Sequence, residues 1–261
     1  PIAIERIIER ALESDFFTES DIFFKNERWH CFELHSSVCA TTKIDFLSLI
    51  NNKLKELREY LITASHIVLT FGTSWVYRFL KTKKIVANCF KIPQKEFQKE
   101  LLSIEEIKTS YNNIVTQILS RNPDTQIITT ISPVRHVKEG IIENNRSKAH
   151  LITALQQLVF EEKKVCYFPS YELMIDQLRD YRFYKEDMIH PNGTAIKIIW
   201  EFFKKTWISK ETESIQKSIR TIRSGLDHQP FDPTSKQHQL FLQDLKTKMN
   251  QVEKEFSHIK F

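Results

Sequence analysis

The chain has 261 residues, of which 41% are hydrophobic and 27% are charged, an ordinary composition for a globular protein. Its 38 Lys and Arg residues stand against 33 Asp and Glu residues, and this near balance argues against nucleic acid as a partner. No segment approaches the run of about 18 apolar residues that a membrane span needs, so we expect no membrane partner.

The cysteines form no C-x-x-C pair and lie among apolar residues; they are Cys31, Cys39, Cys89 and Cys166. This pattern favours reduced thiols over a disulfide framework or a zinc site. We therefore expect a cytoplasmic location, unless a signal precedes Pro1 in the full-length protein, and neither a metal nor another cofactor.

The N-terminal third is predicted to hold two helices and a buried strand. Apolar residues at helical spacing predict helices over 1–14 and 44–63, joined by an irregular aromatic connection over 21–41. A run of apolar residues then predicts a strand over 66–71, which ends at Gly72.

A hairpin is predicted to follow, with strands over 75–79 and 84–89 around a Lys-Thr-Lys-Lys turn. Ser103 followed by Glu106 is a capping box, which predicts a helix to about residue 120. A second apolar strand is expected over 126–131.

The remaining elements are a helix over 144–161, a strand over 164–168, and helices over 171–178 and 193–208. Strands of this length that alternate with helices predict a doubly wound α/β domain with a mainly parallel sheet over residues 1–209.

The composition changes beyond residue 209. A polar helix over 210–223, a linker near 224–234 that contains glycine and two prolines, and a charged amphipathic helix over 235–257 are expected. We interpret residues 210–261 as a pendant helical tail rather than a second core.

In an open parallel sheet, ligands bind outside the carboxyl ends of the strands. The strand over 66–71 leads to Gly72, and the strand over 126–131 leads to Ser132, Arg135 and His136. Asp187 and His190 lie just before the last helix of the domain. The sequence therefore predicts one site that these segments share.

Asp187 and His190 have the spacing of an orienting acid and a general base. A neutral His190 would accept a proton from a nucleophile, and Asp187 would fix the tautomer of the imidazole. The backbone N–H of Gly72 and the amide of Asn88 would stabilise an oxyanion. Each residue also has a structural interpretation: a solvated loop for the pair, a strand end for Gly72, and a hydrogen bond within the hairpin for Asn88.

The substrate-binding candidates are Ser132, Arg135 and His136, since a guanidinium offers a planar fork of donors for carboxylate or phosphate. Asn144 is interpreted as a helix cap rather than a ligand. Ser36, Ser74 and Ser132 were compared as nucleophiles, and none lies in a G-x-S-x-G elbow. The residues alone therefore identify no nucleophile.

Several ordered blocks together resemble the GSCFA family, a bacterial group that is similar to the SGNH (GDSL-like) hydrolases. They are F-G-T-S-W-V-Y (71–77), V-A-N-C-F-K-I-P (86–93), S-P-V-R-H (132–136), E-N-N-R-S-K-A (143–149), F-P-S-Y-E-L-M (168–174) and D-M-I-H-P-N (187–192). The resemblance covers most of residues 1–208. It implies a flavodoxin-like three-layer fold, with His190 as the base and Asp187 as its acid.

The Gly-Ser-Cys-Phe-Ala motif that names the family does not occur in this sequence. The resemblance therefore implies that the nucleophilic serine, with the first strand, lies upstream of Pro1. It further implies hydrolysis of an ester in a small molecule or a carbohydrate. The G-x-N oxyanion block is matched only in part, because Ser74 stands where the asparagine would be. The alternative is a non-catalytic scaffold that binds an anionic or carbohydrate ligand.

Overall fold

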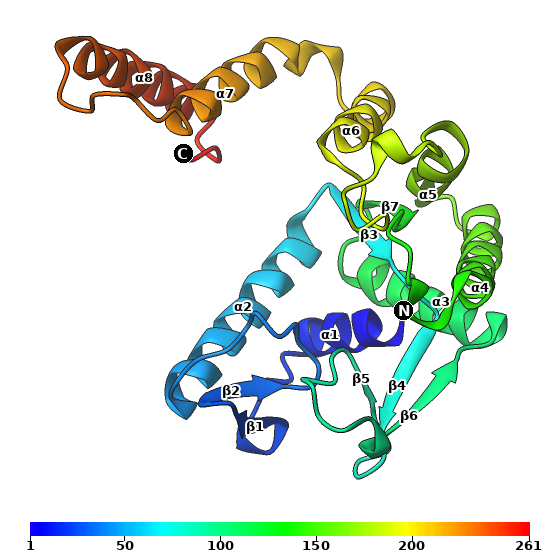
Figure 1. The fold of residues 1–261 in the computed structure, drawn as a ribbon. Coiled ribbons are helices and arrows are strands. Elements are labelled where there is room, and N and C mark those ends of the chain that lie inside the picture. The colour runs from blue at the N-terminus through cyan, green and yellow to red at the C-terminus, as the bar shows by residue number, and fades with distance from the viewer. The chain divides into compact units, whose positions relative to one another are not determined.

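In the computed structural model, three parallel strands form the central sheet, in the order β3, β7, β8 (Figure 1). They are β3 (His66–Phe71), β7 (Gln126–Ile131) and β8 (Val165–Phe168). The predictions of the strands over 66–71 and 126–131 are confirmed, and the third strand begins one residue later than predicted. The mixed α/β class and the parallel pairing are confirmed as well.

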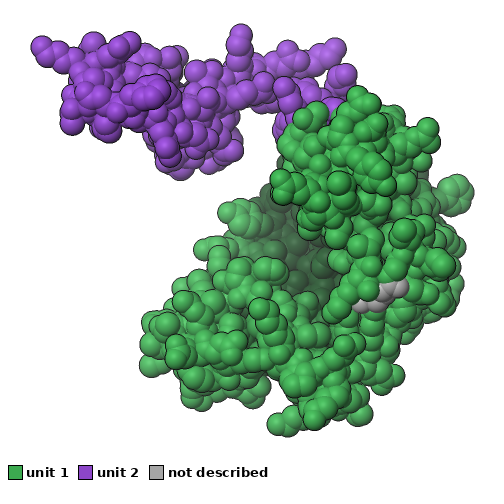
Figure 2. Space-filling view, viewed as in Figure 1, with its two compact units in different colours: residues 1–196 green, residues 197–261 purple. Residues whose placement is uncertain are grey.

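The structure describes residues 1–261 apart from the side chain of Glu139, and it divides them into two units (Figure 2). Unit 1 is Pro1–Ile196 and unit 2 is Lys197–Phe261. The boundary lies inside helix α6 (Gly193–Trp207), upstream of the predicted boundary after residue 209.

The helices of unit 1 pack together beside this sheet and supply most of its core. They are α1 (Ile2–Glu13), α2 (Lys43–Thr63), α3 (Ile104–Arg121), α4 (Ile141–Glu161) and the short α5 (Ser170–Glu172), which continues as a π-helical turn over Leu173–Gln177. The predicted capping box opens α3, where Ser103 and Glu106 satisfy each other's backbone N–H groups. Tyr111 of α3 packs on Phe71 of β3, with ring centroids 4.5 Å apart.

Strand β3, at one edge of the sheet, differs from the middle strand β7 in its burial. The five residues Ile127–Ile131 of β7 are all buried, as in a strand covered on both faces. On β3, by contrast, His66, Val68 and Thr70 are exposed, and Val68 is 52% exposed, so the prediction that this strand is buried is wrong for one of its faces. Within the described residues, β3 therefore keeps one open face and one edge without a partner strand.

A second, antiparallel sheet lies between β3 and α3 in the sequence. It has the order β5, β4, β6 and consists of β4 (Trp75–Phe79), β5 (Ile85–Val86) and β6 (Phe97–Leu101). The predicted hairpin is β4 with β5, although β5 is shorter than predicted. The strand β6 was not predicted, because the alternation of Phe97-Gln98-Lys99-Glu100-Leu101 is weak. Trp75 pairs with Leu101, so the segment begins and ends at one place.

The connection over residues 21–41 is not irregular, as the sequence suggested, but contains a hairpin of β1 (Ile22–Lys25) and β2 (Arg28–Cys31). Asn26 and Glu27 form its two-residue turn with φ angles of 48° and 59°. Positive φ at both central positions matches the twist of paired strands, and asparagine tolerates it better than most residues.

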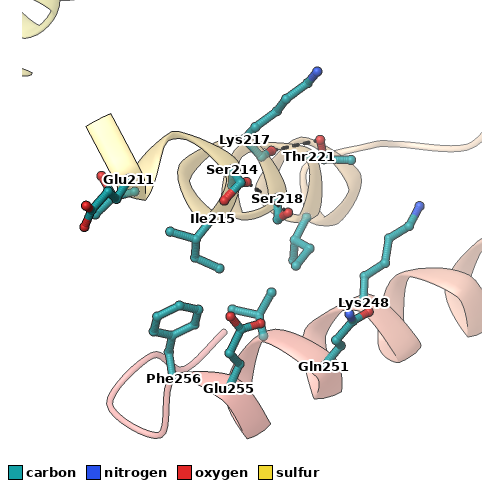
Figure 3. Close-up of a pocket in the computed structure, with 13 residues that line it drawn as sticks. Glu211, Ser214, Ile215, Lys217, Ser218, Thr221, Lys248, Gln251, Glu255 and Phe256 are labelled. Carbon is teal, nitrogen blue, oxygen red and sulfur yellow. Dashed lines mark hydrogen bonds between the residues drawn. The ribbon is translucent and has the colours of Figure 1, made fainter. Parts of the chain in front are cut away.

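Unit 2 contains, after α6, the helices α7 (Glu213–Leu226) and α8 (Lys236–Glu255), joined near the predicted linker. Ile222, Leu245 and Val252 are buried between them, so the prediction of a tail without a core of its own is wrong. Gly225 lets the helices approach, since a Cβ there would lie 2.7 Å from Cδ1 of Leu245. A cavity of about 790 Å³ lies along the seam (Figure 3), with no histidine or cysteine among its described lining residues.

Candidate functional site

Asp187 and His190 form a hydrogen-bonded pair in the loop before α6. Oδ2 of Asp187 lies 2.7 Å from Nδ1 of His190. Oδ1 accepts the backbone N–H groups of His190 and Ile189, each at 2.9 Å. These hydrogen bonds, with that of the imidazole, lower the pKa of Asp187 to about 2. A carboxylate can only accept, so Nδ1 carries a proton, and the neutral form of the imidazole then has its lone pair on Nε2.

The loop over residues 185–192, here called the dyad loop, is closed by its own backbone. The N–H of Lys185 donates to the carbonyl of His190 at 2.8 Å, and Met188 between the acid and the base has φ 57°. Asn192 ends the loop by accepting the N–H groups of Thr194 and Ala195, which caps α6. The pair is thus held in place locally, while its side chains stay 44% and 51% exposed.

Arg135, from the segment after β7, contacts the dyad loop. Its Nη2 donates to the carbonyl of Met188, and its guanidinium lies over the ring of Tyr184, 4.7 Å from the ring centre. Predicted as a substrate ligand, Arg135 is therefore also a support for the loop that carries His190.

His190 lines a cavity of about 380 Å³ at the carboxyl ends of β3 and β7. Arg135 and His136 line it too, as the sequence predicted for one shared site. The other lining residues come from the dyad loop, from the segments after β3 and β7, and from the antiparallel sheet of β5, β4 and β6, here called the inserted sheet. They are Thr73, Trp75, Tyr77, Lys99, Val134, Val137, Lys138 and Ile189. The sequence had singled out none of these, of which Thr73 brings a hydroxyl group.

Gly72 lies beside this cavity rather than in its wall. A Cβ at Gly72 would be 3.5 Å from Nε2 of His136, which is ordinary van der Waals contact. Its carbonyl accepts a hydrogen bond from Nζ of Lys148 at 2.7 Å. The glycine is thus next to the site, but neither steric contact nor a positive φ requires it there.

Side chains of helix α4 form hydrogen bonds with the segments that follow β3 and β7. Nζ of Lys148, whose residue is 2% exposed, donates to the carbonyls of Gly72 and Ser132, both at 2.7 Å. Burial lowers the pKa of Lys148 to about 8. Oγ of Ser147 accepts the N–H of Ser74 at 2.8 Å and lies 3.0 Å from Oγ1 of Thr73. One helix face therefore fixes the geometry of the segments after β3 and β7.

Asn144 belongs to the same face, and the prediction that it caps the helix is wrong. The helix begins three residues earlier, after Gly140, whose φ of 98° suits glycine. Oδ1 of Asn144 instead accepts the backbone N–H of His136 at 2.9 Å. Their spacing places Asn144, Ser147 and Lys148 on one face of the helix, but it does not reveal that this face is buried.

Of the predicted site residues, Gly72, Asn88, Ser132 and Asp187 are not among those that line the cavity of His190. Asn88 lines a neighbouring cavity of about 440 Å³. Its Oδ1 accepts the N–H of Phe90 at 2.8 Å, which is a local hydrogen bond just after the hairpin. Ser132 accepts the N–H of Val134 through its Oγ at 3.2 Å. Their roles in binding stay predictions, but the structure does not bring either side chain next to His190.

Among the described residues, no serine or cysteine lines the cavity of His190. Ser74 is 0% exposed, and its Oγ donates to the carbonyl of Ser147 at 3.1 Å.

Within the same described residues, no group of three His, Cys, Asp or Glu side chains can hold a metal ion. A search of those residues finds no helix with the length and apolarity to cross a bilayer.

Comparison with known families assigns both units. The GSCFA family matches residues 1–203, and the GSCFA domain protein, C-terminal domain, matches residues 219–261. None of the curated proteins compared with the chain matches it. The first match spans the dyad, its cavity and the face of α4 beneath it, and the second spans most of the α7–α8 pair. Because the family match covers well over half of its length, the chain belongs to the GSCFA family.

Proposed function

We propose that the protein is a serine hydrolase of the SGNH type, which acts on ester bonds in acyl esters or acylated carbohydrates. The observation that carries this proposal is the 2.7 Å contact between Asp187 and His190 with His190 in the wall of a cavity. A carboxylate held on Nδ1 leaves Nε2 as the base, which is the arrangement that nucleophilic catalysis by a hydroxyl group needs.

The proposed reaction has two steps. Nε2 of His190 takes the proton of a serine hydroxyl group as its oxygen attacks the ester carbonyl, and the imidazolium is stabilised by Asp187. The imidazolium then protonates the leaving alcohol as the bond from the acyl carbon to that alcohol breaks. Water attacks the acyl-serine with His190 again as the base, which releases the acid and restores the serine.

The oxyanion would be stabilised by donors from the segment after β3. We keep the backbone N–H of Gly72 in this role and replace Asn88 with Thr73, since Thr73 lines the same cavity as His190. Oγ1 of Thr73 accepts the N–H of Trp75 at 3.0 Å and lies 3.0 Å from Oγ of Ser147. When Ser147 donates in that pair, the hydroxyl proton of Thr73 is left for the substrate.

The nucleophilic serine is proposed to lie on a strand outside the printed sequence that pairs with the open edge of β3. The support, within the described residues, is the edge of β3 without a partner strand and the exposed face at Val68, next to β7 with its five buried residues. A strand parallel to β3 would end near Gly72, at the edge of the sheet where His190 lies. This strand would also complete the doubly wound, three-layer arrangement.

The test uses a longer version of the protein that includes the sequence before Pro1, assayed with 4-nitrophenyl acetate and butyrate. We expect His190→Ala to lower kcat/KM by about a thousandfold or more. The matched control is His35→Ala, because His35 is an exposed histidine with a serine hydroxyl group, that of Ser37, 2.8 Å from its Nδ1. Equal activity, or equal inactivity, of the wild type and His190→Ala would refute the assignment.

The printed chain alone is expected to be inactive on these esters. If this chain turns over esters and Ser74→Ala abolishes that turnover, the nucleophile has been misplaced.

The competing candidate is a scaffold that binds an anionic ligand without chemistry. It is favoured by the cationic Arg135 and Lys138 in a cavity with no serine among its described lining residues. An intact Gly-Ser-Cys-Phe-Ala block upstream would favour the enzyme, and its loss would favour the scaffold.

A further inference from the structure

The cavity that holds Asn88 adjoins the cavity of His190, since Tyr77 and Lys138 line both. Its walls come from the inserted sheet and from the segment that connects β5 to β6. The remaining lining residues are Val86, Ala87, Asn88, Cys89, Lys91, Ile92, Gln94 and Phe97. With volumes of about 380 and 440 Å³, each cavity is of a size found in small-molecule sites.

The charged side chains among the described lining residues of these two cavities are all basic. Their described lining residues include Lys91, Lys99, Arg135 and Lys138, and no aspartate or glutamate. The whole chain, by contrast, carries 33 acidic residues against 38 basic ones. Arg135 is held by the dyad loop, and Nζ of Lys99 lies 4.4 Å from the centre of the Trp75 ring. Lys91 and Lys138, both exposed, are therefore the cations that face the second cavity.

Aromatic and aliphatic side chains form part of the walls between these charges. Trp75 lies in the first cavity, Tyr77 lies at the junction, and the buried Phe97 and Val86 line the second. Aromatic rings that are apolar on their faces and polar at one edge suit ligands that are themselves part apolar and part polar, such as sugar rings. Ammonium groups on flexible stems bind carboxylate oxygens as point charges.

We propose that the second cavity is a binding subsite for a uronic acid unit, and that the substrate is an acylated acidic saccharide. The ester would lie beside His190, the sugar that carries it against Trp75 and Tyr77, and the carboxylate near Lys91 and Lys138. The position of the ester rests on the proposed hydrolase function, whereas the binding of an acidic saccharide in the second cavity does not.

Cys89 provides a local readout, because its thiol lines the second cavity and is half-buried. Burial raises the pKa of Cys89, so alkylation by iodoacetamide is followed at mildly alkaline pH by mass spectrometry. The probes are trigalacturonic acid and its neutral trimethyl ester, which differ in charge and by one methyl group on each carboxyl group. Cys39, half-buried and outside both cavities, is the internal control.

We expect trigalacturonic acid to slow the alkylation of Cys89 about fivefold at about four times its Kd, and the trimethyl ester to protect far less. Lys138→Gln and Lys91→Gln should each raise the apparent Kd about tenfold. Lys53→Gln, which removes an exposed lysine of α2, should leave it unchanged. Rates are compared with and without probe inside each variant, because the charge of Lys138 also favours the Cys89 thiolate.

Equal protection by the acid and its ester, or no protection at millimolar acid, would overturn the subsite. Protection that Lys91→Gln and Lys138→Gln leave intact would overturn it as well. Trigalacturonic acid should protect Cys89 in the His190→Ala variant as it does in the wild type. If that protection persists in a longer protein that shows no esterase activity, the hydrolase proposal fails while the subsite stands.

Discussion

Replacement of Lys148 by methionine tests the buried cation beneath the cavity. The variant keeps most of the side-chain volume but loses both hydrogen bonds to the carbonyls of Gly72 and Ser132. Hydrogen bonds from a charged donor contribute about 1.5–3 kcal/mol each. The lowered pKa, from 10.5 to about 8, means that burial of the ammonium group costs on the order of 3 kcal/mol below pH 8. The two effects are similar in size near neutral pH, so the pH dependence is more informative than the stability itself.

The sign follows from proton binding. Between about pH 8 and pH 10.5, the unfolded chain holds a proton on Lys148 that the folded protein has released. The free energy of unfolding of the wild type should therefore rise with pH in this window, relative to that of Lys148→Met, by up to about 1.4 kcal/mol per pH unit. Below pH 8 the difference between the two proteins should be constant.

Urea unfolding followed by far-UV circular dichroism, from about pH 7 to about pH 10, measures this difference. Lys53→Met, which changes an exposed lysine of α2, is the control and should follow the wild type at every pH. A difference that stays flat or falls as the pH rises would refute the reasoning, because it would mean that the two carbonyls, rather than burial, govern the ammonium group.

Two further substitutions test contacts that hold each unit together. Arg135→Gln should speed amide hydrogen exchange within the dyad loop about tenfold, through loss of a charged hydrogen bond, whereas Arg182→Gln, which breaks an exposed ion pair, should leave that exchange unchanged. Equal exchange in both variants would rule out the support by Arg135. Gly225→Val should lower the free energy of unfolding of unit 2 by about 2 kcal/mol by pushing on Leu245, whereas Gly193→Ala, with nothing within 4 Å of its new Cβ, should not. If the Gly225→Val variant is as stable as the wild type in thermal unfolding, the side chain of Leu245 can move aside without cost and the reasoning fails.

The central sheet was predictable from sequence because its strands are short apolar runs between breakers. The strand β3 ends at Phe71, just before Gly72, and β7 ends shortly before Pro133. The pairing of Asp187 with His190 was predictable for a similar reason, since three residues of separation within one tight loop let both side chains meet. Local signals of this kind depend little on the rest of the fold.

The face of α4 beneath the site could not be predicted in this way. Asn144, Ser147 and Lys148 are polar residues that periodicity assigns to solvent, yet all three are buried. Their partners are backbone groups and hydroxyl groups of segments that lie far away in the sequence. Only the fold brings these partners within reach, so no local pattern reports them. The hairpin of β1 and β2 was missed for a different reason, since its turn residues Asn26 and Glu27 are not a typical hairpin pair.

The inserted sheet has a consequence for how this protein family can change its ligands. Trp75 and Leu101, the first and last residues of the insertion, are paired, and the N–H of Leu102 donates to the carbonyl of Ser74 at 3.0 Å. Among the described residues, none of its strands pairs with the parallel sheet. The segment is instead tied to the N-terminal part of the chain, since the N–H of Ala87 donates to the carbonyl of Phe32 at 2.8 Å and Nη1 of Arg6 donates to the carbonyl of Ile85 at 2.7 Å. A chimaera with the inserted sheet of a relative would therefore also have to carry the N-terminal residues that contact it.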